Sequence, residues 1–164
     1  MNSDAANDHR QFYKGGIQAI YKRIGSYLPD HYPLGDNADQ TLDFSDLRQS
    51  TYGTVMFTTD FGCSACKLEP VIAFAERYPF FNYRLFLHNG DETLERMKEL
   101  RSLGMPIEVC HLGDIAPILS SLAPAAFAIN SQLQIVSCGI YRDLDDLEQI
   151  AYPFIRVSKK SVPI

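Results

Sequence analysis

Two cysteines separated by two residues constrain this chain more than any other feature. Cys63 and Cys66 stand between an apolar, β-branched run at 55–59 and a helical pattern of apolar residues that begins near Leu68. The run is typical of a buried strand, and the pattern repeats at intervals of three and four residues. We therefore expect both cysteines on a turn that leads from a strand into a helix, with Cys63 at or near the helix start.

This placement indicates a specific chemistry for the two sulfurs. Unpaired backbone N–H groups and the positive end of the helix dipole stabilise a thiolate at a helix start. In a Cys-X-X-Cys motif such effects can lower the pKa of a cysteine from about 8.5 to roughly 3.5–7.5. Cys63 is thus the expected nucleophile. Cys66, one helical turn further on, is expected to resolve the mixed disulfide by closing a 63–66 bond.

A zinc site is the alternative interpretation, because one Cys-X-X-Cys pair can supply half of a tetrahedral set of ligands. The sequence contains no second pair of this kind. Cys110 and His111 are adjacent, so on a strand they point to opposite faces and cannot easily ligate together, and Cys138 stands alone. The motif beside alternating strands and helices favours redox chemistry, and we expect no metal and no cofactor.

Composition and charge exclude several other classes of protein. The chain has 164 residues, of which 46% are hydrophobic and 21% charged, as in a globular domain large enough to bury its own core. A net charge of −5 without a Lys/Arg cluster gives no reason to expect nucleic acid. No apolar run reaches the 18 or so residues of a membrane span, and the polar, acidic N-terminus does not resemble a signal peptide.

The order of predicted elements indicates an α/β fold. Residues 1–40 are expected to form an N-terminal extension with one helix at about 17–27 and a turn-rich connector, and residues 41–164 the main domain. Strand–helix–strand order implies parallel pairing, and a late hairpin implies antiparallel pairing, so we expect a mixed central sheet with helices on both faces. Strands are predicted at 41–44, 55–59, 83–87, 107–111, 125–129 and 134–139, and helices at 45–48, about 63–78 (kinked at Pro70), 93–103, 115–122 and 143–155.

The chain resembles the thioredoxin superfamily, and within it the TlpA-like and ResA-like group that includes the cytochrome c maturation thioredoxins. Three features carry the resemblance: Cys63-Ser64-Ala65-Cys66-Lys67, Glu69 three residues after the second cysteine, and the stretch 122–130, which resembles the segment around the family's cis-proline. The resemblance covers about residues 41–155. It implies a thioredoxin-like fold in which residues 90–122 form the TlpA-type strand–helix insertion.

Three positions depart from the family pattern. Gly62 stands where the family usually has Trp, and the chain contains no Trp. Pro70 comes one residue earlier than usual after Cys66. Ala123 replaces the Val, Thr or Ile that commonly precedes the cis-proline. These departures bear on the substrate and the redox potential more than on the fold.

The resemblance also implies roles for residues around the cysteines. A partly buried Glu69 would exchange protons with Cys66 during resolution, and a solvated glutamate paired with Lys67 or Arg77 is the alternative. Pro124 is expected to be cis, so that the backbone of Ala123 can pair with a substrate strand. An ordinary trans-proline turn is the alternative. The predicted substrate-binding residues are Gly62, Ala123 and Pro124, and the predicted catalytic residues are Cys63, Cys66 and Glu69.

The function implied is that of a thiol-disulfide oxidoreductase that reduces or exchanges disulfides in partner proteins. A copper- or haem-assembly thiol carrier and a redox-inactive interaction module are the alternatives. We expect protein disulfide or dithiol substrates, a separate redox partner and a monomer. The family favours an extracytoplasmic compartment, with the cytoplasm as the alternative. Cys110 and Cys138 are predicted to be small core residues, and a second disulfide between them is the alternative.

Overall fold

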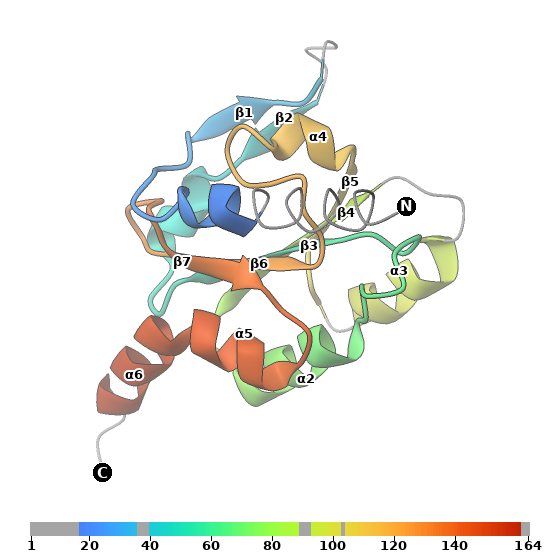
Figure 1. The fold of residues 1–164 in the computed structure, drawn as a ribbon. Helices are drawn as coiled ribbons and strands as arrows, with labels where there is room; N and C mark the ends of the chain where they lie inside the picture. Colours follow the sequence, from blue (N-terminus) through green and yellow to red (C-terminus); the bar gives the residue numbers. More distant parts are fainter. Residues whose placement is uncertain (1–16, 36–39, 89–92, 103, 162–164) are drawn as a thin grey trace, which may run out of the picture.

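A five-stranded sheet lies at the centre of the computed structural model, which describes residues 17–35, 40–88, 93–102 and 104–161 (Figure 1). Its strands are β3 (Thr54–Thr59), β4 (Asn82–His88), β5 (Ile107–Cys110), β6 (Ala125–Ile129) and β7 (Ile135–Ile140). They lie in the order β5-β4-β3-β6-β7. The pairs β3–β4 and β4–β5 are parallel, whereas β3–β6 and β6–β7 are antiparallel. The predicted mixed sheet is therefore confirmed.

Helices cover both faces of this sheet, as predicted. The remaining elements are β1 (His31–Pro33), β2 (Thr41–Asp43), η1 (Ser45–Gln49), α2 (Glu69–Arg77), α3 (Thr93–Ser102), α4 (Leu112–Ile115), α5 (Leu144–Ile150) and α6 (Tyr152–Ser161). Figure 1 shows α2, α5 and α6 on one side of the sheet, and α4 with the small β1–β2 sheet on the other. The buried residues form two clusters that follow this division.

Strand β3 leads to the two cysteines, and all six of its residues are buried. Alternate residues of a strand face opposite sides. Val55 and Phe57 accordingly belong to the cluster under α2 and α5, and Met56 belongs to the cluster on the other face. Burial on both faces explains why this strand is a nearly continuous apolar run in the sequence.

Phe74 joins α2 to the sheet. This side chain is fully buried, and its ring centroid lies 6.5 Å from that of Phe57 on β3 and 6.3 Å from that of Tyr83 on β4, both in edge-to-face geometry. Such pairs add about 0.5–1.5 kcal/mol to the burial of apolar area. The strand before the cysteines and the helix after them are thus packed against each other.

The described N-terminal residues, 17–35, pack against the main sheet. The helix predicted over 17–27 is helical only over 17–21, because the backbone then turns to pair with the β6–β7 region. Gly25, with φ of +89°, donates its N–H to the Ile135 carbonyl at 2.7 Å. Part of the predicted connector forms β1, which pairs with β2. The division of the chain at residue 40 stays a prediction, and residues 1–16 lie outside the described part.

Two later helices differ from their predictions because of prolines. The helix predicted at 115–122 lies instead at Leu112–Ile115, and Pro117 has no N–H with which to continue it. The helix predicted at 143–155 is divided at Ala151, where Pro153 cannot donate to the carbonyl of Gln149. None of the helices in the described part of the chain is long and apolar enough to cross a lipid bilayer.

Substitution of Gly53, which immediately precedes β3, tests the packing of α6 on this strand. Gly53 has φ of +102°, and a Cβ there would lie 2.6 Å from a ring carbon of Phe154. We expect Gly53→Ala to lower the free energy of unfolding by about 2–4 kcal/mol, because a positive φ costs about 1–2 kcal/mol and the displaced ring adds to it. Urea unfolding measures the loss.

Gly25→Ala is the matched control for this substitution. Gly25 also has a positive φ, but nothing lies within 4 Å of the added Cβ. The free energy of unfolding of this variant should fall only by the backbone contribution of about 1–2 kcal/mol. Equal losses in the two variants would show that Phe154 does not pack against Gly53 as described.

Candidate functional site

Cys63 and Cys66 lie on a tight turn between β3 and α2. The Cys66 N–H donates to the Cys63 carbonyl at 3.1 Å, and the Cys63 N–H donates to the Asp60 carbonyl at 3.0 Å. Helix α2 begins only at Glu69. The predicted helix start at Cys63 is therefore wrong, and the two cysteines are related by a turn that precedes the helix.

Pro70 explains why α2 begins so late. A proline inside a helix has no N–H to donate and its ring clashes with the carbonyl four residues earlier, which here belongs to Cys66. Pro70 instead occupies the first turn of α2, where no donor is required. The predicted kink within the helix is therefore absent. Because the influence of a helix dipole fades beyond the first turn, the dipole of α2 does not act on Cys63 as expected.

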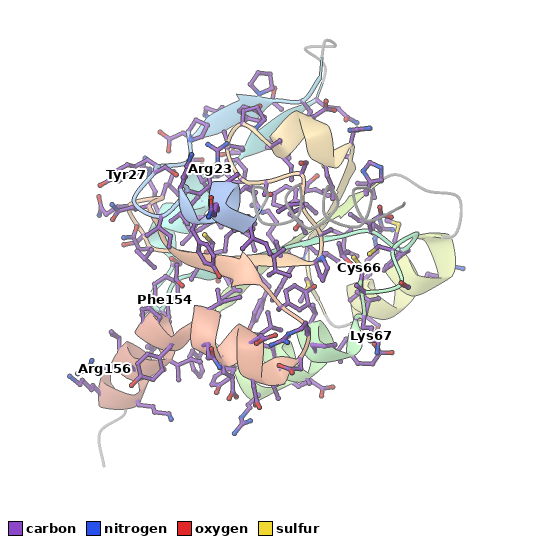
Figure 2. The ribbon with its side chains drawn as sticks, viewed as in Figure 1. Arg23, Tyr27, Cys66, Lys67, Phe154 and Arg156 are labelled. Atoms are coloured by element: carbon purple, nitrogen blue, oxygen red, sulfur yellow. The ribbon has the colours of Figure 1, made fainter. Side chains whose placement is uncertain are left out.

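The two cysteines are nevertheless close enough to react with each other. They lie 3.6 Å apart as free thiols. Because a disulfide joins sulfurs about 2.05 Å apart, a small side-chain movement closes the pair. Cys63 is partly exposed, whereas only 4% of Cys66 is exposed. Figure 2 shows Cys66 and the neighbouring Lys67 on this turn, on the opposite side of the view from Arg156 of α6.

Burial makes the two thiols chemically unequal. It raises the pKa of the Cys66 thiol from 9.0 to about 11, and the neighbouring Cys63 adds to the shift. The backbone of Asp60 and the hydroxyl of Thr59 act in the opposite direction and lower this pKa. Cys66 is thus held as a thiol at neutral pH, while Cys63 is the sulfur that a partner molecule can reach. This asymmetry suits Cys63 to the first contact and Cys66 to a later step.

A cleft of about 360 Å³ opens beside the two cysteines. Its wall combines apolar side chains with the exposed charges of Lys67 and Glu69. Because Glu69 is exposed, the partial burial on which its predicted proton exchange depends is absent. Gly62 is exposed next to Cys63 but does not line the cleft. The lining residues are Phe61, Cys63, Ser64, Cys66, Lys67, Leu68, Glu69 and Ile72.

The loop before β6 contains the Ala123–Pro124 peptide bond, which is cis. The Thr58 hydroxyl donates to the Leu122 carbonyl at 2.7 Å, and the Tyr141 N–H donates to the Pro124 carbonyl at 3.4 Å. These bonds tie the loop to the ends of β3 and β7. Pro124 is buried and Ala123 is partly exposed, but neither lines the cleft. Their contact with a substrate stays a prediction.

Two hydroxyl residues next to Cys66 were not predicted from the sequence. Thr59 ends β3 and is fully buried, and Tyr141 follows β7 and is 1% exposed. Burial raises the pKa of Tyr141, and the nearby Cys66 adds to that shift. Thr59 could have been noticed as the polar end of an apolar strand. Tyr141 carries no signal in the sequence, because only the pairing of β6 with β7 brings it to the site.

The other two cysteines lie in the core, as predicted. Cys110 and Cys138 are buried free thiols, and the Cys138 thiol donates to the Ile20 carbonyl at 3.2 Å. Burial raises the pKa of each to about 11. In this form they are small, protonated core residues with no part in the cleft.

A pair of histidines lies at the ends of β4 and β5. The ring centroids of His88 and His111 are 4.8 Å apart. Their Nδ1 atoms accept backbone N–H groups of Leu112 and Gly113, each at 3.2 Å. The Nδ1 atom of each ring is therefore already engaged by the backbone. Within the described ranges no group of three or more His, Cys, Asp or Glu residues could hold a metal ion.

Comparison with known proteins identifies the fold. No family model and no curated protein matches this chain. Solved structures do match. One is a thiol:disulfide interchange protein from Bacteroides sp., with 15% identity and a TM-score of 0.54, covering 79% of this chain and 90% of that one. Another is the thioredoxin domain of a thiol-disulfide oxidoreductase from Bacteroides vulgatus, with 15% identity and a TM-score of 0.53, covering 78% of this chain and 97% of that one. A third is a secreted disulfide oxidoreductase from Mycobacterium tuberculosis, with 13% identity and a TM-score of 0.54, covering 75% of this chain and 94% of that one. At such identities the likeness shows the fold alone, which is thioredoxin-like.

The difference in exposure between the two cysteines predicts the order of their alkylation. At neutral pH, iodoacetamide should modify Cys63 at least about tenfold faster than Cys66, because alkylation requires an accessible thiolate and Cys66 is buried with a raised pKa. Peptide mass mapping over time measures both rates. In Cys63→Ser the remaining thiols should all react slowly. Faster modification of Cys66 than of Cys63 would contradict the described burial.

The buried thiols also predict how stability depends on pH. Cys66, Cys110 and Cys138 have pKa values raised from 9.0 to about 11. Between these values the folded protein binds more protons than the unfolded chain, so the free energy of unfolding falls as pH rises from 9 towards 11. Urea unfolding at several pH values measures this fall. Cys110→Ala/Cys138→Ala should show a shallower fall, and an equal slope in both proteins would contradict the assignment.

Proposed function

We propose that this protein is a thiol-disulfide oxidoreductase that exchanges disulfides with partner proteins through a mixed disulfide. The observation that carries the proposal is the pair of unequal thiols, with partly exposed Cys63 lying 3.6 Å from buried Cys66 at the wall of a cleft. The names of the similar structures support it, since they are a thiol:disulfide interchange protein and thiol-disulfide or disulfide oxidoreductases.

In the reducing direction, the reaction proceeds in two exchange steps. The Cys63 thiolate attacks one sulfur of the partner's disulfide, a Cys63–partner bond forms, and the other partner sulfur leaves as a thiolate that takes up a proton. Cys66 then loses its proton and attacks the Cys63 sulfur. The 63–66 disulfide forms, the second partner sulfur leaves, and the protein has given up two electrons. A separate redox partner restores the dithiol, and the reverse sequence oxidises a partner.

The partner chain would lie along the exposed edge of the turn. Gly62 has no side chain to obstruct the approach to Cys63, and partly exposed Ala123 would offer its backbone hydrogen-bonding groups to an extended segment. Buried Pro124 would hold that backbone in place. Glu69 lines the same cleft, and from its exposed position it would exchange protons with Cys66 through water.

The setting proposed for this activity follows the same comparisons. One similar structure is that of a secreted disulfide oxidoreductase, which favours an extracytoplasmic compartment. The segment 90–122, proposed as the TlpA-type insertion, contains α3, β5 and α4. We propose that the protein acts as a monomer on protein disulfides.

Substitution of each cysteine separates the two steps. Cys63→Ser should lose essentially all insulin-reducing activity, because no other sulfur in the cleft is exposed. Cys66→Ser should still attack a protein disulfide but should accumulate the mixed disulfide, which the second sulfur no longer resolves. Turbidity of reduced insulin measures the activity, and non-reducing electrophoresis measures the trapped species.

Cys138→Ala is the control for this experiment, because it removes a buried thiol that does not line the cleft. It should retain the activity of the unchanged protein. Substantial activity in Cys63→Ser, or the absence of any mixed disulfide in Cys66→Ser, would refute the proposed function. Activity lost equally in Cys138→Ala would instead indicate a general loss of structure.

A further inference from the structure

Sheet pairing brings two buried hydroxyl groups to the edge of the sheet at which the cysteines lie. Thr58 of β3 pairs with Ala125 of β6, and Ala125 pairs with Ile140 of β7. The next row across these antiparallel strands therefore contains Thr59, Pro124 and Tyr141. The Tyr141 N–H donates to the Pro124 carbonyl at 3.4 Å, which supports this row.

Both hydroxyl side chains face the side of the sheet that α2 covers. Thr59 follows Val55 and Phe57 at intervals of two, so its side chain lies on their face of β3. Tyr141 belongs to the same buried cluster as Phe57, with ring centroids 6.1 Å apart in edge-to-face geometry. Leu68, two residues after Cys66, belongs to that cluster as well. The hydroxyls of Thr59 and Tyr141 thus converge on the region below the cysteine turn.

Neither hydroxyl group has another use in the described part of the chain. Thr59 Oγ1 and the Tyr141 hydroxyl are fully buried, and no hydrogen bond of ordinary geometry satisfies either one. Leaving a buried polar group without a partner costs about 1–3 kcal/mol. Both lie near enough to Cys66 to interact with it, since Thr59 lowers the pKa of that thiol and Cys66 contributes to the raised pKa of Tyr141.

No carboxylate side chain is among the groups that shift the Cys66 pKa in the described structure. The titratable groups that do interact with it are Cys63, in the same turn, and Tyr141, after β7. Asp60 acts through its backbone, and its carboxylate accepts the Gly62 N–H at 2.9 Å. Lys67 and Glu69 are exposed in the same turn. The buried sulfur must therefore become negative in surroundings that offer hydroxyl donors rather than a buried base.

We propose that the hydroxyl groups of Tyr141 and Thr59 donate hydrogen bonds to the Cys66 thiolate as it forms, and so allow this buried sulfur to resolve the mixed disulfide. This inference rests on the proposed function. The Cys66 proton passes to water in the cleft, which Cys66 lines. The Cys66–Cys63 bond then forms as the Cys63–partner bond breaks, and the partner sulfur leaves as a thiolate that takes up a proton. A hydrogen bond to an ionised group is roughly twice as strong as one between neutral groups.

The test follows the two steps separately with dithiobis-nitrobenzoate, an aromatic disulfide that releases a coloured thiol at each step. With one equivalent of reagent, Cys63 releases the first thiol and Cys66 releases the second. Tyr141→Phe and Thr59→Val should leave the first release unchanged and slow the second about tenfold at neutral pH, because each loses a hydrogen bond to a charged group. The pH profile of the second release should move to higher pH in both.

The chain offers a matched control for each variant. Thr54 lies at the other end of β3, and its buried hydroxyl also has no partner, so Thr54→Val makes the same chemical change away from Cys66. Tyr83 stacks on Phe57, and its hydroxyl donates to the Tyr78 carbonyl at 2.6 Å. Tyr83→Phe should therefore lower stability without slowing the second release. Tyr141→Phe should slow the second release without lowering stability, because its hydroxyl has no partner to lose in the dithiol form.

The outcomes distinguish this proposal from the proposed function. An unchanged second release in both Tyr141→Phe and Thr59→Val overturns the role of the hydroxyls, as does an equal slowing in Thr54→Val. If circular dichroism shows that one variant does not fold, the other variant alone tests the proposal. A second release whose pH profile moves to higher pH supports the role of the hydroxyl, and an unchanged profile overturns it. Failure of the unchanged protein to release the second thiol would refute the dithiol mechanism itself.

Discussion

The burial of β3 on both faces is the constraint on which the candidate site depends. Because neighbouring strands and two core clusters enclose all six residues of this strand, its C-terminal end has a defined position relative to β6 and β7. The cysteine turn begins there, and Phe74 then anchors the following helix back on Phe57. A turn held at both ends in this way keeps Cys63 near the surface while it places Cys66 against the core. The unequal exposure of the two sulfurs is thus a consequence of how the strand and the helix pack.

Burial, rather than a helix dipole, is what distinguishes the Cys66 thiol from the more exposed Cys63 thiol. The charged form of a buried group loses its hydration, and this loss raises the pKa of Cys66. A helix start at Cys63 would have supplied an additional stabilisation of its thiolate, but Pro70 moves the start of α2 to Glu69. The proposed order of reaction between the two cysteines therefore rests on their access and burial. In this chain the hydroxyl of Thr59 and the backbone of Asp60 offset part of the desolvation at Cys66.

Much of the fold and the main reactive pair could be predicted from local sequence. The apolar runs of β3 and β6 indicate strands because both faces of these strands are buried, and the Cys-X-X-Cys spacing identifies the thiols whatever the exact backbone between them. Short elements were harder to predict from the sequence. Strand β1, for example, contains Pro33 and forms through its pairing with β2. The predicted helix boundaries were wrong where a proline removes a backbone hydrogen-bond donor, as at Pro70 and Pro153. Tyr141 could not be predicted, because its place beside Cys66 arises from strand pairing between residues far apart in the sequence.

Phe57 bears on the role proposed for the hydroxyl groups near Cys66. This fully buried ring stacks on Tyr83 and meets the rings of Phe74 and Tyr141 edge-on, so the core beneath the cysteine turn is aromatic. An ionised carboxylate in such surroundings would carry a large desolvation cost at all times. A hydroxyl is neutral, costs less to bury, and interacts most strongly with Cys66 when that sulfur is charged. Unpartnered hydroxyls at Thr59 and Tyr141 therefore suit the proposed exchange, in which Cys66 becomes negative during one step only.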